Sequence, residues 1–145
     1  MDDVNIDRIM ENMGFIMLVV HKKILKMELG GFPENITRLH MAVMGELSQT
    51  SMTMSELAKT LMMTKPQLTH VVDPLVSSGI VERRPDEKDR RVINLALTEK
   101  GRVLLKEMKQ KVKENTKNRL ATLTPEELAQ MSDTLETLRN IVSKL

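Results

Sequence analysis

The sequence predicts a mainly α-helical fold with one small β-hairpin: a winged helix-turn-helix flanked by N- and C-terminal helices. Two observations predict this fold. Apolar residues recur every three or four positions over most of the chain, and the period changes to two only over residues 80–97. In addition, Thr-x-x-Glu or Thr-x-x-Gln capping boxes begin at Thr53, Thr64 and Thr124. The length of 145 residues suits one domain or one subunit of an oligomer.

The composition excludes several classes of protein. The chain has no Cys, which excludes a disulfide framework, a thiolate nucleophile and Cys-ligated zinc. Two Phe and no Tyr or Trp leave almost no aromatic platform for stacking bases. No apolar run approaches the ~20 residues that span a bilayer, and the N-terminus is acidic rather than basic. We therefore expect a cytoplasmic protein that does not bind membranes.

The N-terminal third predicts one long amphipathic helix. Its end is predicted at Leu29-Gly30-Gly31-Phe32-Pro33, because Gly caps helices and Pro cannot continue them. Such a long apolar helix must pack against something, and a partner subunit is a natural candidate. Its apolar stripe comprises Ile6, Ile9, Met10, Met13, Ile16, Met17, Val20, Ile24 and Met27.

Three shorter helices follow. Thr37 is the predicted N-cap of the first, whose inner face comprises Leu39, Val43, Met44 and Leu47. A short helix over residues 54–61 follows the Thr53 capping box, and Met62-Met63 make a tight connection. The third helix begins after Thr64, ends at Gly79 and should kink at Pro74. Its predicted buried face comprises Leu68, Val71, Val72, Leu75 and Val76.

The hairpin comes next. Residues 80–84 and 92–97 predict two strands, joined by a charged, turn-rich tip over residues 85–90. Thr98 then caps a long helix, and Thr124-Pro125-Glu126-Glu127 opens the last one. The apolar stripe of that last helix comprises Leu128, Met131, Leu135, Leu138, Val142 and Leu145.

The central segment indicates a function. Two helices joined by about four residues, the second with an exposed polar face, form a helix-turn-helix whose second helix can enter the DNA major groove. A charged hairpin directly afterwards makes this a winged helix, whose Arg-rich tip can reach the minor groove.

These residues resemble a known family, the MarR family of winged-helix transcription regulators. The resemblance rests on Ser55-Glu56-Leu57-Ala58-Lys59 and on the helix from Gln67 to Asp73. It continues through Gly79-Ile80-Val81-Glu82-Arg83-Arg84-Pro85-Asp86, Asp89-Arg90-Arg91 and Leu97-Thr98-Glu99-Lys100-Gly101. It covers residues 37–101 strongly, and the flanking helices match in placement alone.

The resemblance implies a homodimer. Residues 37–97 would form the winged helix that binds DNA, and residues 1–36 and 98–145 would be the helical dimerisation part. The dimer would bind a pseudo-palindromic operator in double-stranded DNA, with half-sites about one helical turn apart. It would act as a repressor, released by a small phenolic (aromatic) or anionic effector.

The resemblance also implies which residues contact DNA. On the recognition helix, Thr64 and Lys65 would sit at the N-terminus, which favours phosphate, and three side chains would face base edges or phosphates: Gln67, Thr69 and His70. On the wing, the DNA-binding residues would be Arg83, Arg84, Lys88, Asp89, Arg90 and Arg91. Asp89 is expected to orient Arg90 and Arg91. The alternative is a solvated hairpin whose acids neutralise its bases, and Asp73 is expected to be a simple surface charge.

Two positions depart from the family pattern. His70 stands where Arg is frequent, and Pro74 stands where a basic residue is frequent. A neutral His contacts base edges but neutralises less phosphate than Arg does. These departures bear on sequence preference and affinity rather than on the fold.

An effector pocket needs apolar walls and a few polar groups. Met13, Met17, Met41 and Met44 could supply the walls, and His21, Arg38 and His40 could meet a carboxylate. The alternative is that these are core methionines and surface polar residues.

Other functions are less well supported by the residues. The three His are far apart without metal-ligand spacing, so we expect no metal and no cofactor. No motif places a base near a nucleophile, so we expect no enzyme. The surviving alternative to a DNA-binding regulator is a winged-helix protein–protein interaction module that does not bind DNA.

Overall fold

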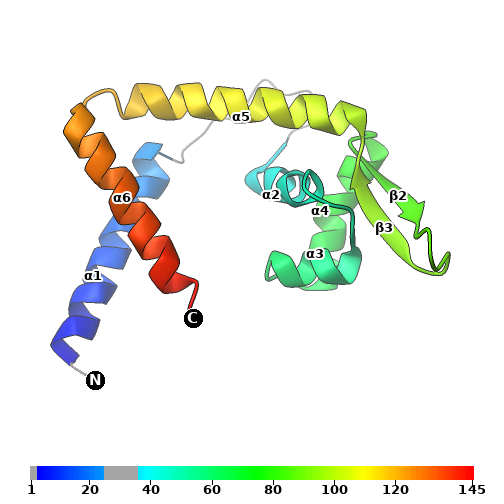
Figure 1. Ribbon diagram of the computed structural model, residues 1–145, viewed down its shortest axis with the longest axis horizontal. Helices are drawn as coiled ribbons and strands as arrows, with labels where there is room; N and C mark the ends of the chain where they lie inside the picture. Colours follow the sequence, from blue (N-terminus) through cyan, green and yellow to red (C-terminus); the bar gives the residue numbers. More distant parts are fainter. Residues whose placement is uncertain (1–2, 25–35) are drawn as a thin grey trace. The chain divides into compact units, whose positions relative to one another are not determined.

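The computed structural model describes residues 3–24 and 36–145 and confirms a mainly helical fold with a small antiparallel sheet (Figure 1). The elements before the sheet are α1 (Asp3–Val19), the π-helical stretch η1 (Val20–Ile24) and α2 (Arg38–Leu47). The winged helix continues with β1 (Met52–Thr53), α3 (Met54–Thr60), α4 (Lys65–Ser77), β2 (Val81–Pro85) and β3 (Ile93–Leu97). Two long helices complete the chain, α5 (Glu99–Arg119) and α6 (Pro125–Val142).

The chain divides into two compact units. Unit 1 comprises Met1–Met27 and Val112–Leu145, and unit 2 comprises Glu28–Lys111. Helix α5 is continuous and contributes residues to both units. No helix within residues 3–24 or 36–145 is both long and apolar enough to cross a membrane.

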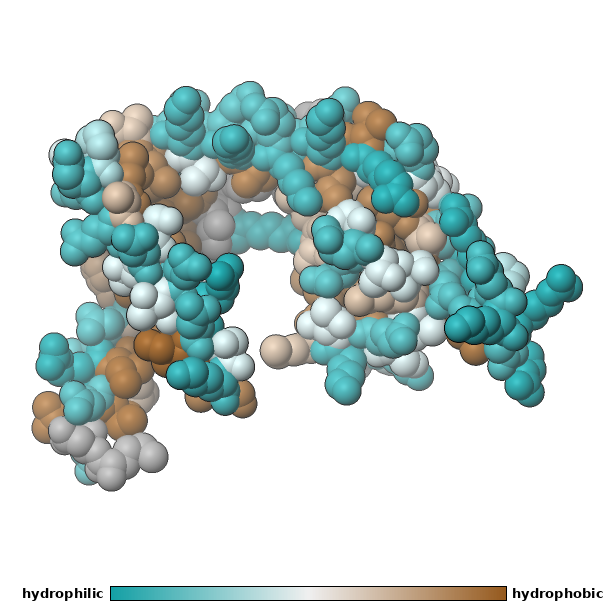
Figure 2. Space-filling model, viewed as in Figure 1, coloured by the Kyte–Doolittle hydropathy of each residue, from teal (hydrophilic) through white to brown (hydrophobic). Residues whose placement is uncertain are grey.

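Unit 1 leaves its apolar side chains at the surface. No residue of α1 or α6 is buried, although both helices carry the predicted apolar stripes (Figure 2). The side chains of Met10 and Phe15 are 67% and 68% exposed. Within this unit, Arg119 Nη1 donates a hydrogen bond of 2.6 Å to the carbonyl oxygen of Lys23. The predicted helix end at residues 29–33 lies outside the described residues.

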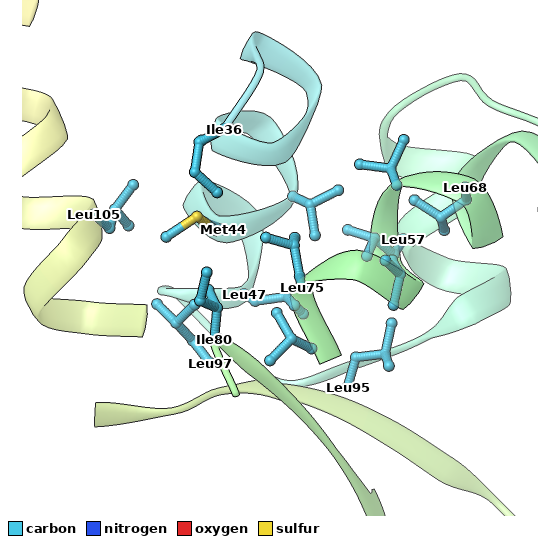
Figure 3. Packing of buried hydrophobic residues seen from close by; sticks show 14 of the residues in the cluster. Ile36, Met44, Leu47, Leu57, Leu68, Leu75, Ile80, Leu95, Leu97 and Leu105 are labelled. Carbon is cyan, nitrogen blue, oxygen red and sulfur yellow. The ribbon is translucent and has the colours of Figure 1, made fainter. Parts of the chain in front are cut away.

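Unit 2 contains the hydrophobic core. Side chains from α2, α3, α4, the sheet and the first turns of α5 meet there, among them Met44, Leu57, Leu75 and Leu95, all at most 1% exposed (Figure 3). The predicted buried faces of α2 and α4 are largely confirmed. Leu39 is an exception: it is 51% exposed, so its assignment to the inner face of α2 was wrong.

Among the described residues, capping boxes begin the four helices α2, α3, α4 and α6. The three predicted boxes are confirmed, since the backbone N–H groups of Thr53, Thr64 and Thr124 donate to the side chains of Glu56, Gln67 and Glu127 over 2.8–2.9 Å. The predicted N-cap Thr37 is confirmed as well. Its partner was not predicted: the His40 ring nitrogen Nδ1 accepts from the Thr37 N–H at 2.9 Å.

The sheet has three strands in the order β1-β3-β2, so the predicted two-stranded hairpin was incomplete. β1 pairs antiparallel with β3 through Met52 opposite Leu95 and Thr53 opposite Asn94. Two residues are too few to show a period-2 pattern, which is why this strand escaped prediction. Strands β2 and β3 each start one residue later than predicted. The Ile80 N–H donates to the Leu75 carbonyl of α4, and the Val92 N–H donates to the Asp89 carbonyl in the wing tip, so neither residue begins a strand.

Helices α3 and α4 end in the same way. In each, the residue after the C-cap has a positive φ, 53° for Met62 and 71° for Gly79. The next N–H then donates back to the helix at 2.9 Å, from Met63 to Ala58 and from Ile80 to Leu75. This is the Schellman motif, in which Gly is the usual residue at the positive-φ position. Met62 therefore occupies a strained backbone conformation.

Replacing Met62 by Gly should stabilise the protein by about 0.5–1 kcal/mol. Glycine relieves the strain, and little burial is lost because Met62 is 94% exposed. Urea denaturation measures the change. Gly79→Ala serves as the counterpart and should destabilise, since it places a Cβ at the equivalent position of α4. A Met62→Gly variant less stable than the parent protein would contradict this account.

The start of α5 is joined to the end of α4. Thr98 caps α5 as predicted, because its hydroxyl accepts from the Gly101 N–H at 3.1 Å. Thr98 also bonds the α4 terminus: its Oγ1 donates to the Gly79 carbonyl at 2.6 Å, and its N–H donates to the Ile80 carbonyl at 3.0 Å. The end of α4 and the start of α5 are therefore linked by hydrogen bonds from the Thr98 hydroxyl and the Thr98 N–H to two main-chain carbonyls.

Candidate nucleic-acid interface

Helix α4 presents one buried and one exposed face. Leu68, Val72 and Leu75 pack into the core, whereas Lys65 and His70 are exposed. Helix α3 packs against α4, and only residues 61–64 join them. This is the helix-turn-helix predicted from the sequence, with the polar face of its second helix open to a partner.

The structure constrains what the first turns of α4 present. The Gln67 carbonyl oxygen Oε1 accepts from the Thr64 N–H at 2.9 Å, so its amide NH₂ group is left to donate. The Thr69 hydroxyl donates to the Lys65 carbonyl at 2.9 Å and keeps its acceptor capacity. In the described part of the chain, the side chains of Lys65 and His70 have no hydrogen-bond or ion-pair partner.

Pro74 lies inside α4, and the helix continues through it to Ser77. Proline has no N–H, so α4 lacks the bond that would normally reach the His70 carbonyl. The predicted kink at this position stays a prediction.

The wing is attached to the recognition helix by an ion pair. Arg83 Nη2 of β2 lies 2.7 Å from Asp73 Oδ1 of α4. Asp73 was expected to be a simple surface charge; it is 52% exposed, and it pairs with Arg83 of the wing strand. Arg84 of the same strand pairs with Glu82. Both strand arginines are thus already engaged by carboxylates.

At the wing tip, Asp89 binds Arg91 in a bidentate pair, with Nε–Oδ1 and Nη2–Oδ2 distances of 3.1 Å. Hydrogen bonds from Arg91 lower the pKa of Asp89, and the same pair raises the pKa of Arg91. Within residues 3–24 and 36–145, no hydrogen bond joins Asp89 to Arg90, so its expected role for both arginines is seen for Arg91 alone. Arg90 and Lys88 are exposed, and neither side chain has a partner in these segments.

The candidate effector residues are distributed over both units. Met13, Met17 and His21 belong to unit 1 and are exposed. In unit 2, Met44 is fully buried in the core, Met41 packs against that core, and the His40 ring caps α2. Arg38 is exposed at the first position of α2. The effector pocket stays a prediction, and Met44 and His40 already have structural roles.

The His40 cap should make stability depend on pH. Partial burial lowers the pKa of His40 below its ordinary value. The unfolded chain therefore binds the proton more readily, and stability should fall as the pH drops below about 6.5 toward the lowered pKa. Protonation also removes the Nδ1 acceptor that Thr37 uses.

Urea denaturation at about pH 7.5 and about pH 5 measures this dependence. His40→Gln is the matched variant, because Gln keeps the capping acceptor, as Gln67 does, and does not titrate. We expect the parent protein to lose more stability than His40→Gln over this interval. Equal losses would show that His40 is not responsible.

A helix-turn-helix with an exposed polar face on α4, followed by an antiparallel wing, defines a winged helix-turn-helix fold. Residues 36–93 match the model of the MarR family. The winged helix of this chain is therefore similar to that of the MarR family.

The curated relatives are similar over part of their length. The transcriptional repressor MprA of Escherichia coli is 41% identical over 54 residues, which are 37% of this chain and 31% of MprA. The transcriptional regulator AdcR of Streptococcus pneumoniae is 39% identical over 61 residues, 42% of each chain. These matches span less than half of either relative. Both relatives are transcriptional regulators rather than enzymes.

Solved structures resemble the chain over nearly its whole length. The transcriptional regulator BldR from Sulfolobus solfataricus superimposes with a TM-score of 0.77 at 27% identity, covering 97% of this chain and 98% of BldR. FabT of Streptococcus pneumoniae, solved in complex with DNA, gives a TM-score of 0.68 at 26% identity, covering 99% of both chains.

Proposed function

We propose that the protein is a homodimeric, sequence-specific DNA-binding transcription regulator that acts in the cytoplasm, most simply as a repressor. The observation that carries this proposal is the set of exposed cations without partners in the described segments: Lys65 on the recognition helix and Lys88 and Arg90 on the wing tip. Cations that are not neutralised within the protein remain available to phosphates. The structural similarity to FabT, which was solved with DNA, supports the same function.

In this proposal, α4 enters the major groove. The Gln67 amide group, the Thr69 hydroxyl and the His70 ring contact base edges, since each keeps a donor or an acceptor. Lys65 and the backbone N–H groups at the α4 N-terminus bind phosphate. Arg90 reaches the neighbouring minor groove, whose negative potential attracts arginine.

The apolar surface of unit 1 supports the proposed homodimer. Large apolar side chains on α1 and α6, such as Ile9 and Ile141, are 52% and 56% exposed. Large apolar side chains gathered at the surface of a helix are typical of interaction sites. A second copy of the chain that covers these side chains forms a dimer with two winged helices, which bind one DNA duplex. Because the dimer has two-fold symmetry, its DNA site is an inverted repeat. The similarity to the repressor MprA favours repression over activation.

We further propose that a small aromatic or anionic effector releases the protein from DNA. Met13, Met17, His21 and Arg38 are the exposed members of the residue set predicted for it. Adding salicylate to the DNA complex tests this step.

Selection from a pool of random duplexes tests the function itself. We expect the enriched sequences to be inverted repeats with half-sites about one helical turn apart. Failure to enrich any sequence would contradict the proposal and favour a protein–protein interaction module.

A further inference from the structure

The wing tip is folded around one carboxylate that the proposed contacts with DNA do not use. We propose that Asp86 is a positioning residue for DNA binding, which holds the tip so that Lys88 and Arg90 project toward DNA, without touching DNA itself. This inference rests on the proposed function, because it concerns the geometry of the same interface.

Asp86 makes four hydrogen bonds that connect the two sides of the tip. Its Oδ2 accepts from the backbone N–H groups of Lys88 and Asp89 at 2.9 and 3.1 Å. Its Oδ1 accepts from Asn94 Nδ2, on β3, at 2.9 Å. Its own N–H donates to the Val92 carbonyl at 2.8 Å. The carboxylate therefore fixes the backbone at Lys88, one of the free cations, and at the residue before Arg90.

The other acids of the wing are used differently. Asp89 binds the Arg91 guanidinium, and Glu82 binds Arg84. Glu87 is exposed and has no partner among residues 3–24 and 36–145. In those segments Asp86 accepts only from N–H groups of the backbone and of Asn94, with no ion pair. These bonds, led by that from the Lys88 N–H, lower the pKa of Asp86 and keep it ionised.

A negative charge beside phosphates opposes DNA binding, so two accounts of Asp86 predict opposite results. If Asp86 acts only through its charge, removing the carboxylate should strengthen binding. If Asp86 positions the tip, removing the acceptors should weaken binding, although a repulsive charge has been deleted. Preorganised contacts lose affinity when the element that carries them becomes mobile.

Three variants separate these accounts, each measured by fluorescence anisotropy with the inverted-repeat duplex recovered by selection. We expect Asp86→Ala to weaken binding about tenfold, comparable to the loss of one contact. Asp86→Asn should bind at least as tightly as the parent protein, because the amide oxygen still accepts from the backbone and Asn94 can turn its own oxygen toward the new amide. Glu87→Ala, the matched removal of an unengaged charge, should bind slightly more tightly.

A double-variant cycle shows whether Asp86 acts through the cations. In a Lys88→Ala, Arg90→Ala background, Asp86→Ala should cause little further loss, whereas an independent role would give the same tenfold loss there. The dependence of affinity on salt should also become shallower in Asp86→Ala, since fewer phosphates are neutralised. Loss of general stability would not produce this coupling.

Asn94→Ala removes only the side-chain bond to Asp86 and provides the test if Asp86→Ala does not fold. It should weaken binding by a smaller factor in the same direction. The inference would be overturned if Asp86→Ala bound DNA as tightly as Glu87→Ala. It would also be overturned if the effects of Asp86→Ala and of the Lys88 and Arg90 changes were additive. Either result would leave the proposed function intact. Parent protein that binds the selected and a scrambled duplex equally would overturn both.

Discussion

Replacing Arg90 by Ala should weaken DNA binding by roughly a hundredfold. Arg90 is exposed at the wing tip, and in the described segments no carboxylate neutralises it. A well-placed contact to a base or phosphate contributes about 1–3 kcal/mol, and a dimer loses two of them. Anisotropy titration with the operator duplex measures the loss. Changing Arg90 and Arg91 together to Ala should abolish binding.

Two comparisons make this prediction specific. Lys144→Ala removes an equal charge from an exposed residue after α6 and should change affinity little. Arg91→Ala should cost less than Arg90→Ala, because Arg91 is already bound to Asp89. If Arg90→Ala bound DNA as tightly as the parent protein, the wing could not be part of the DNA interface.

Replacing Gly101 by Ala should destabilise the protein by about 1–3 kcal/mol. A Cβ at this position would lie 2.3 Å from the Ile80 carbonyl oxygen and 2.6 Å from Leu97 Cδ1. That oxygen is held in place, because it accepts the Thr98 N–H. The start of α5 would have to move away from the end of α4, which disturbs the junction behind the recognition helix.

Thermal denaturation measures the effect of this substitution. Gly45→Ala is the matched control, since a Cβ at Gly45 meets nothing within 4 Å. Alanine in a helix interior is favoured over glycine by up to about 1 kcal/mol, so this variant should gain stability. If Gly101→Ala were as stable as Gly45→Ala, the close approach of α5 to Ile80 would be contradicted.

The fold could be predicted where the signal is local in sequence. The capping boxes at Thr53, Thr64 and Thr124 involve residues three positions apart, and all three are confirmed. β1 could not be predicted, because its two residues are a strand only through pairing with β3, some forty positions away. Leu39 followed the helical period of α2, yet it is half exposed.

The site could be predicted in part, for a similar reason. Residue types and their order placed the cations on α4 and on the wing. The ion-pair partners of these cations could not be predicted, because several acidic residues lie near each arginine in the sequence. The structure separates Arg83, which pairs with Asp73 across ten positions, from Arg90, which has no ion pair in the described segments. In the sequence, Asp86 is only one of several acids at the wing tip. Its carboxylate accepts from backbone N–H groups, and no sequence pattern reveals such bonds.

The most direct test of the central claim is the affinity of the protein for DNA from upstream of its own gene, against scrambled DNA, over a series of salt concentrations. The account predicts binding at least about 10³ times tighter to the upstream DNA, with affinity falling steeply as salt rises. Weak binding, equal for both duplexes at every salt concentration, would contradict it. That result would indicate a winged helix whose partner is another protein.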